Sequence, residues 1–225
     1  ALAHYQRVKE TVKNMSNNES NEVAGTLKLG VSNFFANYEL PYILKLFKQQ
    51  YPHVEFKVVT GWSRDVTQLI HNKDVHISFV RGDYGWRGLS KHQIFEETIC
   101  IASKDKIDMT DLPHLPRIDY RGDYLLKSVI DHWWAENYAE APFISIEVDQ
   151  VDTCKEMVIN GLGYGILSSR VVTGIEDLYK INLLDLEGTP ILRRTWMYYH
   201  KESLEWNVVK AFVHFIENFD WKENG

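Results

Sequence analysis

The alternation of strand and helix patterns is the feature that most restricts the fold of this chain. Residues 26–31 alternate in polarity as a strand does, and apolar side chains then recur at helical spacing over residues 40–47. A second strand pattern covers residues 55–60, a second helix pattern residues 66–70, and a third strand pattern residues 75–80. This β-α-β-α-β order predicts an α/β fold with a parallel sheet, because parallel strands need crossover helices between them.

The second half of the chain repeats this alternation after a change of pattern. Two apolar-rich segments, 89–95 and 98–103, follow each other without room for a helix. Strand and helix patterns then alternate again. The strands are predicted at 117–120, 144–148, 164–167 and 192–199, and the helices at 125–138, 151–160 and 204–219. Two α/β units with strands between them predict two lobes around a cleft.

The first 22 residues differ from the rest of the chain. Tyr5, Val8, Val12 and Met15 form a narrow apolar stripe, which is typical of a short helix that pairs with another helix. The polar run at residues 16–22 has no apolar anchor and indicates a linker. The compact body is therefore expected to begin after this linker.

Composition argues against several classes of function. The 25 Lys and Arg residues face 31 Asp and Glu residues, so the chain lacks the basic excess that supplies non-specific affinity for DNA. We expect this segment alone not to bind DNA. Cys100 and Cys154 lie in apolar patterns without CxxC spacing, which predicts two buried thiols in a reducing, cytoplasmic compartment. No signal-peptide pattern and no membrane-length apolar stretch is present in the sequence.

The motif search favours neither an enzyme nor a metal or cofactor site. The glycines of GLGYG at 161–165 follow a helix pattern and precede a strand, which reverses the context of a dinucleotide-binding loop and indicates a helix stop. GxxxxGK[ST], GxSxG and HExxH are absent from the sequence. The closest histidines, His71 and His76, share no helical face, so no metal site is predicted. Trp133 and Trp134 lie on an amphipathic helix without flanking basic residues, which predicts core packing.

Polar residues follow each of the first three predicted strands. They are Ser32 and Asn33 after the first strand, Trp62, Ser63 and Arg64 after the second, and Arg81 after the third. The carboxyl ends of parallel strands meet at one edge of a sheet, where α/β proteins bind their ligands. Each residue has an ordinary alternative role, since Ser63 could cap its helix and Arg64 or Arg81 could be solvated. Their convergence is what predicts a binding site.

Four segments carry a resemblance to a known family. They are GTLKLG at 25–30, Leu40-Pro41 before a helix that ends at Tyr51-Pro52, Val75 to Ser78, and GLGYGIL at 161–167. In these segments the chain resembles the effector-binding part of LysR-type transcriptional regulators. It departs from the family at 74–77, where Leu-Asp is more usual, and at 168–169, where proline is common. The family's N-terminal winged helix-turn-helix has no counterpart here, so we expect a regulatory domain of a longer regulator that contacts DNA through that segment.

The resemblance implies two Rossmann-like subdomains of the type 2 periplasmic-binding-protein-like class, joined by crossover strands around an effector cleft. The implied boundaries are residues 1–22 for a linker helix and linker, 23–97 with 195–225 for subdomain I, and 98–194 for subdomain II. Transferred position by position, the resemblance also implies the residues of the cleft. They are Ser32, Asn33, Trp62, Ser63, Arg81, Thr98 and the helix start from Val151 to Thr153.

The residues favour an anionic effector, and a small carboxylate is our prediction, with a neutral or phosphorylated metabolite as the open alternative. Helix starts near Ser32, Ser63 and Asp152 direct N–H groups and positive dipole ends toward the predicted cleft. Arginine side chains add fixed positive charge. These are Arg64, Arg81 and Arg121, and we expect Arg81 to make the main contact.

Self-association is expected as well. In the family the linker helix and the regulatory domain mediate it, which implies dimers within a longer tetramer. The apolar stripe of the N-terminal helix and the face of the helix around residues 43–51 offer apolar surface for a homodimer.

Two alternatives remain open from the sequence. A bilobal solute-binding protein of a transporter shares the two-lobe architecture, although it needs no dimerising helix at its N-terminus. An enzyme on the same lobes is weaker still, because no nucleophile and base can be named.

Overall fold

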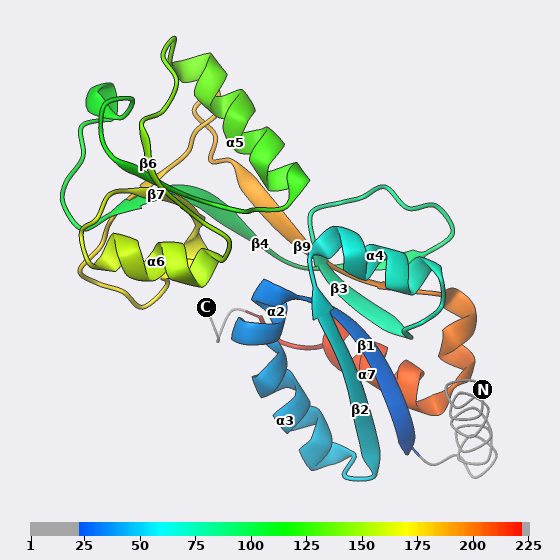
Figure 1. The fold of residues 1–225 in the computed structure, drawn as a ribbon. Coiled ribbons are helices and arrows are strands. Elements are labelled where there is room, and N and C mark those ends of the chain that lie inside the picture. Colours follow the sequence, from blue (N-terminus) through cyan, green and yellow to red (C-terminus); the bar gives the residue numbers. More distant parts are fainter. Residues whose placement is uncertain (1–22, 222–225) are drawn as a thin grey trace. The chain divides into compact units, whose positions relative to one another are not determined.

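The computed structural model describes residues 23–221, which divide into two compact units. Unit 1 comprises residues 23–95 and 194–221, and unit 2 comprises residues 96–193. The chain passes from one unit to the other within two long strands, β4 (Ser90–Ser103) and β9 (Leu192–Tyr199) (Figure 1). The predicted N-terminal paired helix and linker lie outside the described residues.

The sheet of unit 1 confirms the predicted parallel arrangement. Strand β1 (Gly25–Ser32) pairs in parallel with β2 (Val54–Gly61) on one side and β3 (Ile77–Arg81) on the other. The first part of the sheet has the order β2-β1-β3-β9, with β9 antiparallel to β3. The carboxyl ends of β1, β2 and β3 therefore lie at one edge.

Helices cover both faces of this sheet (Figure 1). Helices α3 (Leu40–Gln50) and α7 (Asn207–Glu217) share one face, where the rings of Phe47 and Phe212 lie 4.9 Å apart. Helix α4 (Ser63–His71) covers the other face. A methyl group added at Gly30 of β1 would lie 3.3 Å from Val66 of α4, so β1 and α4 approach closely.

Two expectations for unit 1 need correction. Ile43 and Phe47 are fully buried, so the helix around them does not expose the apolar face expected of it; its apolar side is needed for the core. A short helix, α2 (Asn33–Tyr38), follows β1 directly and was not predicted. Its six residues span too few turns to produce a periodic pattern. A 3-10 turn, Lys201–Glu205, precedes α7.

Unit 2 contains the remaining strands of the seven-stranded sheet and a separate two-stranded sheet. Strand β4 pairs antiparallel with β7 (Gly165–Ser168) and with β8 (Tyr179–Asn182), whereas β5 (Arg117–Tyr120) pairs in parallel with β6 (Ile144–Val148). The two segments predicted at 89–95 and 98–103 are one continuous strand. The prediction separated them because Glu96 and Glu97 interrupt the apolar pattern, although the carboxylate-bearing Glu97 is buried.

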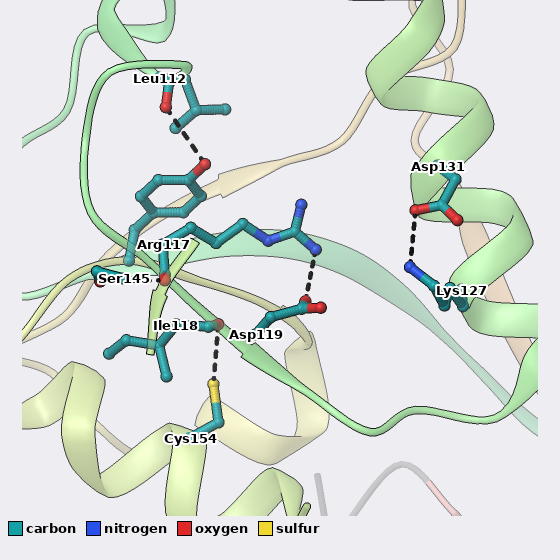
Figure 2. Close-up of polar contacts among 9 residues, drawn as sticks. Leu112, Arg117, Ile118, Asp119, Lys127, Asp131, Ser145 and Cys154 are labelled. Carbon is teal, nitrogen blue, oxygen red and sulfur yellow. Dashed lines mark hydrogen bonds and ion pairs between the residues drawn. The ribbon is translucent and has the colours of Figure 1, made fainter. Parts of the chain in front are cut away.

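The helices of unit 2 close over its apolar interior. They are α5 (Tyr124–Asn137) and α6 (Val151–Ile159), with 3-10 turns at Met109–Asp111 and Ser169–Val172. Trp133 and Trp134 are buried, which confirms core packing, and each indole N–H donates to a backbone carbonyl. Arg117 is buried too, and its guanidinium pairs with the Asp119 carboxylate at 2.7 Å (Figure 2).

Candidate functional site

The predicted polar cluster of unit 1 forms at the carboxyl ends of β1, β2 and β3. Ser32, the last residue of β1, pairs in register with Gly61, the last residue of β2. Ser63 Oγ accepts a hydrogen bond from the backbone N–H of Arg81 at the end of β3, at 3.1 Å. Because β1 lies between β2 and β3, this bond spans the end of β1. The structure thus brings Ser32, Ser63 and the Arg81 backbone together, as predicted.

The Ser32 hydroxyl is the most informative group in this cluster. Ser32 is only 3% exposed, and its Oγ has no hydrogen-bond partner among the described residues. Strand side chains alternate between faces, so Ser32 points to the same face as Gly30, which is the face covered by α4. A buried hydroxyl without a partner costs free energy, so a polar ligand beside it would be stabilising.

The first turn of α4 adds backbone donors at the same place. Trp62 precedes the helix and provides no side-chain cap. The first N–H groups of an α-helix have no acceptor within the helix, and the helix dipole makes this end favourable for negative charge. The Ser32 hydroxyl and the α4 start therefore form one set of donors suited to an anionic group.

The Arg81 side chain does not join this set. It lies on the face of Phe79, two residues earlier, whose ring stacks on Phe35 at 4.4 Å. The guanidinium carbon lies 3.8 Å from the centre of the Phe34 ring, and Arg81 is only 4% exposed. The alternative of a solvated Arg81 is therefore wrong. Its backbone meets Ser63, whereas its charge is packed against α2.

Because Arg81 is buried, replacing it should lower the stability of the free domain. We expect Arg81→Ala to lower the free energy of unfolding by about 2 kcal/mol, because the substitution removes a packed side chain and its cation–π contact with Phe34. The exposed Arg64 provides the control, since Arg64→Ala should change stability by less than about 0.5 kcal/mol. Urea denaturation of both variants measures the difference. Equal stabilities would contradict the packed position of Arg81.

The remaining predicted residues occupy varied positions. Asn33 is the half-buried first residue of α2, and Trp62 is half-buried at the end of β2. In unit 2, the Thr98 hydroxyl donates to Asn182 Oδ1 at 2.9 Å, which ties β4 to β8. The backbone N–H of the exposed Arg121 donates to Val148 at the end of β6, close in sequence to the start of α6. That helix start contains the half-buried Val151 and the exposed Thr153.

Sequence reasoning missed Thr195. This residue of β9 is fully buried, its hydroxyl has no hydrogen-bond partner among the described residues, and it stands opposite Arg81 in the strand register. Directly opposed residues of antiparallel strands share a face, so Thr195 lies beside the Arg81 side chain. Strands β3 and β9 are far apart in the sequence, so the apolar pattern could not predict that Arg81 and Thr195 pair.

A charged group follows the end of β3 as well. The Asp83 carboxylate accepts hydrogen bonds from Lys91 Nζ at 2.5 Å and from the Tyr198 hydroxyl at 2.9 Å. The bond from Lys91, with those from the Gly85 N–H and Tyr198, holds the pKa of Asp83 below its usual value despite some burial. Asp83 is therefore ionised and its charge is compensated locally.

The two cysteines are free and buried, as predicted. Burial raises the pKa of the Cys100 thiol to about 11 and that of the Cys154 thiol to about 12. Cys154 Sγ donates to the carbonyl of Ile118 at 3.5 Å (Figure 2). In the described part of the chain, no three His, Cys, Asp or Glu side chains are grouped as metal ligands.

These pKa values predict unreactive thiols. At pH 8 fewer than about one in a thousand of these thiols is ionised, against about one in four for a free cysteine, and only the thiolate attacks a disulfide reagent. We expect the native chain to react with 5,5′-dithiobis(2-nitrobenzoic acid) only at the rate of unfolding. Adding urea should release two equivalents at once. Rapid reaction of the native chain would contradict this burial.

Comparisons with known proteins agree with this architecture. A family model described as the LysR substrate binding domain matches residues 20–220. The chain is 41% identical over 216 residues to the uncharacterized HTH-type transcriptional regulator YraN of Bacillus subtilis, covering 96% of this chain and 73% of that protein. It is 31% identical over 221 residues to YkuM of the same organism, an uncharacterized HTH-type transcriptional regulator, covering 97% and 74%. These relatives are regulators rather than enzymes or transport proteins.

Solved structures show the same fold at low sequence identity. The cofactor-binding domain of the Cbl transcriptional regulator has a TM-score of 0.71 at 20% identity, covering 91% of this chain and 92% of that chain. CbnR, a LysR family transcriptional regulator, has a TM-score of 0.64 at 15% identity, covering 96% and 78%. The predicted α/β class with two Rossmann-like subdomains is thus confirmed. In the described residues, no helix combines the length and apolar character needed to cross a membrane.

Proposed function

We propose that this chain, which belongs to the LysR family of transcriptional regulators and contains their substrate-binding domain, senses a small anionic metabolite at the carboxyl ends of β1 and β2. The metabolite is a carboxylate. Its binding would control transcription by the longer regulator, in the cytoplasm.

The observation that carries this proposal is the buried Ser32 hydroxyl, which has no partner within the described residues, beside the uncapped start of α4. A carboxylate accepts hydrogen bonds from a hydroxyl and from backbone N–H groups, and it is favoured at the positive end of a helix dipole. Arg64 and Asp65 are both exposed in the first turn of α4 and offset each other's charge, so the preference for an anion rests on the hydroxyl and N–H donors. These groups complement a carboxylate better than a cation.

Binding to variants of two serines tests this proposal. Ser32 and Ser78 are both buried with unpartnered hydroxyls, but Ser78 lies three residues before the end of β3, inside the sheet. Removing either hydroxyl should leave the free domain at least as stable, because no hydrogen bond is lost. Among the carboxylates succinate, citrate and 2-oxoglutarate, the one that binds should bind Ser32→Ala about tenfold more weakly and Ser78→Ala unchanged.

Calorimetric titration measures these affinities. Equal affinity of wild type and Ser32→Ala would remove Ser32 from the site. Binding of the corresponding neutral amides as tightly as the acids would contradict an anionic effector.

Assembly and DNA contact complete the proposal. Strand β2 ends the described sheet of unit 1 and exposes Val58 and Val59, and an exposed apolar edge strand favours pairing with another chain. We therefore expect a homodimer or a larger oligomer by sedimentation. With a net charge of −6, this segment should bind DNA poorly by itself, so DNA contact belongs to a helix-turn-helix outside these residues. Tight, sequence-dependent binding in an anisotropy titration would contradict this division of roles.

A further inference from the structure

Unit 2 contains a pocket that the proposed function does not use. Its volume is about 170 Å³. The lining comes from the segment after β4, the residues before β5 and the turn after α6, and consists of Ser103, Lys104, Asp105, Lys106, Ile107, Leu115, Pro116, Gly161, Gly163 and Tyr164.

The pocket is separate from the residues predicted to bind the effector in unit 2. Pro116 immediately precedes β5, whereas Arg121 immediately follows it. Gly161 follows α6, whereas Val151 is its first residue. The pocket and the predicted effector residues therefore lie at opposite ends of both elements. A ligand here would be a second ligand of the domain.

The charged groups of the lining favour an anion. The lining includes the ammonium groups of Lys104 and Lys106 and a single carboxylate, that of Asp105. Lys104 Nζ lies 3.7 Å from Asp177 Oδ2, and the Asp177 side chain is 87% exposed, so this pair is weak and its lysine can turn to a ligand. The net charge of the lining is positive.

The end of α6 does not cancel this preference. Helix carboxyl ends disfavour anions because their last carbonyls have no partner in the helix. Here the Gly161 N–H donates to Val158 O at 3.0 Å and the Leu162 N–H to Met157 O at 3.1 Å. Gly161 has a φ of 76°, which permits this turn and leaves no side chain at that point of the pocket wall. The carbonyls of Met157 and Val158 are thus occupied, which reduces the negative charge that this helix end presents to the pocket.

The apolar part of the lining determines what kind of anion fits. Ile107, Leu115, Pro116 and the ring of Tyr164 give the pocket an apolar wall, and Tyr164 is only 1% exposed. A cavity of about 150 Å³ lined by apolar side chains can hold benzene. The volume here, about 170 Å³, is similar. We propose that this pocket binds a small organic anion with a compact apolar body, of the size of benzoate.

Fluorine NMR of 4-fluorobenzoate with the whole chain tests this inference. We expect saturable binding that the double substitution Lys104→Gln/Lys106→Gln weakens about tenfold, because both ammonium groups are lost. Lys127→Gln is the matched control, since Lys127 is an exposed lysine of the same unit whose ion pair is with Asp131. That variant and wild type should bind equally. 4-Fluorobenzamide, which has the same ring without the charge, should bind much more weakly.

Ser32→Ala separates this pocket from the proposed effector site. We expect it to bind 4-fluorobenzoate as wild type does, even where it loses affinity for the metabolite carboxylates. The absence of saturable binding by wild type up to about 10 mM would overturn the inference. Binding that survives the double lysine substitution, or that is lost in Ser32→Ala instead, would also overturn it. None of these results would alter the test of the effector site, which measures the binding of different ligands.

Discussion

Replacing Gly163 by alanine is expected to lower the free energy of unfolding by about 3–5 kcal/mol. Gly163 has a φ of 155°, which side-chain-bearing residues rarely adopt, and an added Cβ would lie 2.4 Å from the carbonyl oxygen of Pro116. That oxygen accepts the backbone N–H of Tyr164 at 3.0 Å. It cannot retreat from the methyl group without weakening the link between the segment before β5 and the segment before β7.

Gly188→Ala is the matched control for backbone strain alone. Gly188 has a φ of 80°, and an added Cβ would have no atom within 4 Å. This variant should lose only about 1 kcal/mol, the cost of placing alanine in a left-handed conformation. Chemical denaturation of both variants compares these two glycines, which both belong to unit 2. Similar losses would mean that the contact with Pro116 contributes nothing.

The sequence pattern predicted the fold where periodicity is strong. The predicted strands 144–148 and 192–199 coincide with β6 and β9, and the predicted helix at 125–138 differs from α5 by one residue at each end. Strand β8 was missed, although β5 is equally short and was predicted. Element length alone therefore does not explain the omission.

The start of β3 shows a different limit. The predicted strand began at Val75, but β3 begins at Ile77. His76 Nδ1 accepts a hydrogen bond from the backbone N–H of Lys28 at 3.1 Å, and the backbone N–H of His76 donates to the carbonyl of Lys28. The His76 side chain thus takes the place of a backbone carbonyl as the acceptor for Lys28 of β1. Regular pairing between β1 and β3 therefore begins only after His76. No apolar pattern reports such an exchange.

The candidate site was predictable in its location but not in its side-chain directions. Ser32, Ser63 and Arg81 were placed at one sheet edge from the βαβ order alone, and they lie there. Side chains alternate between the two faces of a sheet, so the face of the last side chain depends on the exact residue at which the strand ends. A shift of one residue would place a side chain on the opposite face, and the Arg81 guanidinium lies on the face of Phe34 and not on that of the Ser32 hydroxyl.

Substitution of Asp123 should destabilise unit 2 through two separable interactions. The Asp123 carboxylate accepts the backbone N–H of Leu126 at 3.1 Å, which caps α5, and it also pairs with the guanidinium of Arg193 in β9. The side chains of Arg193 and Asp123 are 10% and 7% exposed. Asp123→Ala removes the cap and leaves a buried cation without its carboxylate, so we expect a loss of about 3–5 kcal/mol in the free energy of unfolding.

Asp123→Asn separates the cap from the charge. Asparagine caps helices about as well as aspartate does, so this variant keeps the bond to Leu126 and loses only the ion pair. It should therefore be more stable than Asp123→Ala by about 1 kcal/mol, the usual value of a helix cap. Thermal and urea unfolding at low and high salt measure both variants. Because the pair is buried, salt should narrow the gap between wild type and Asp123→Asn very little. A gap that closes in salt would mean that Asp123 and Arg193 meet in solvent, and equal stabilities of the alanine and asparagine variants would mean that the cap contributes nothing.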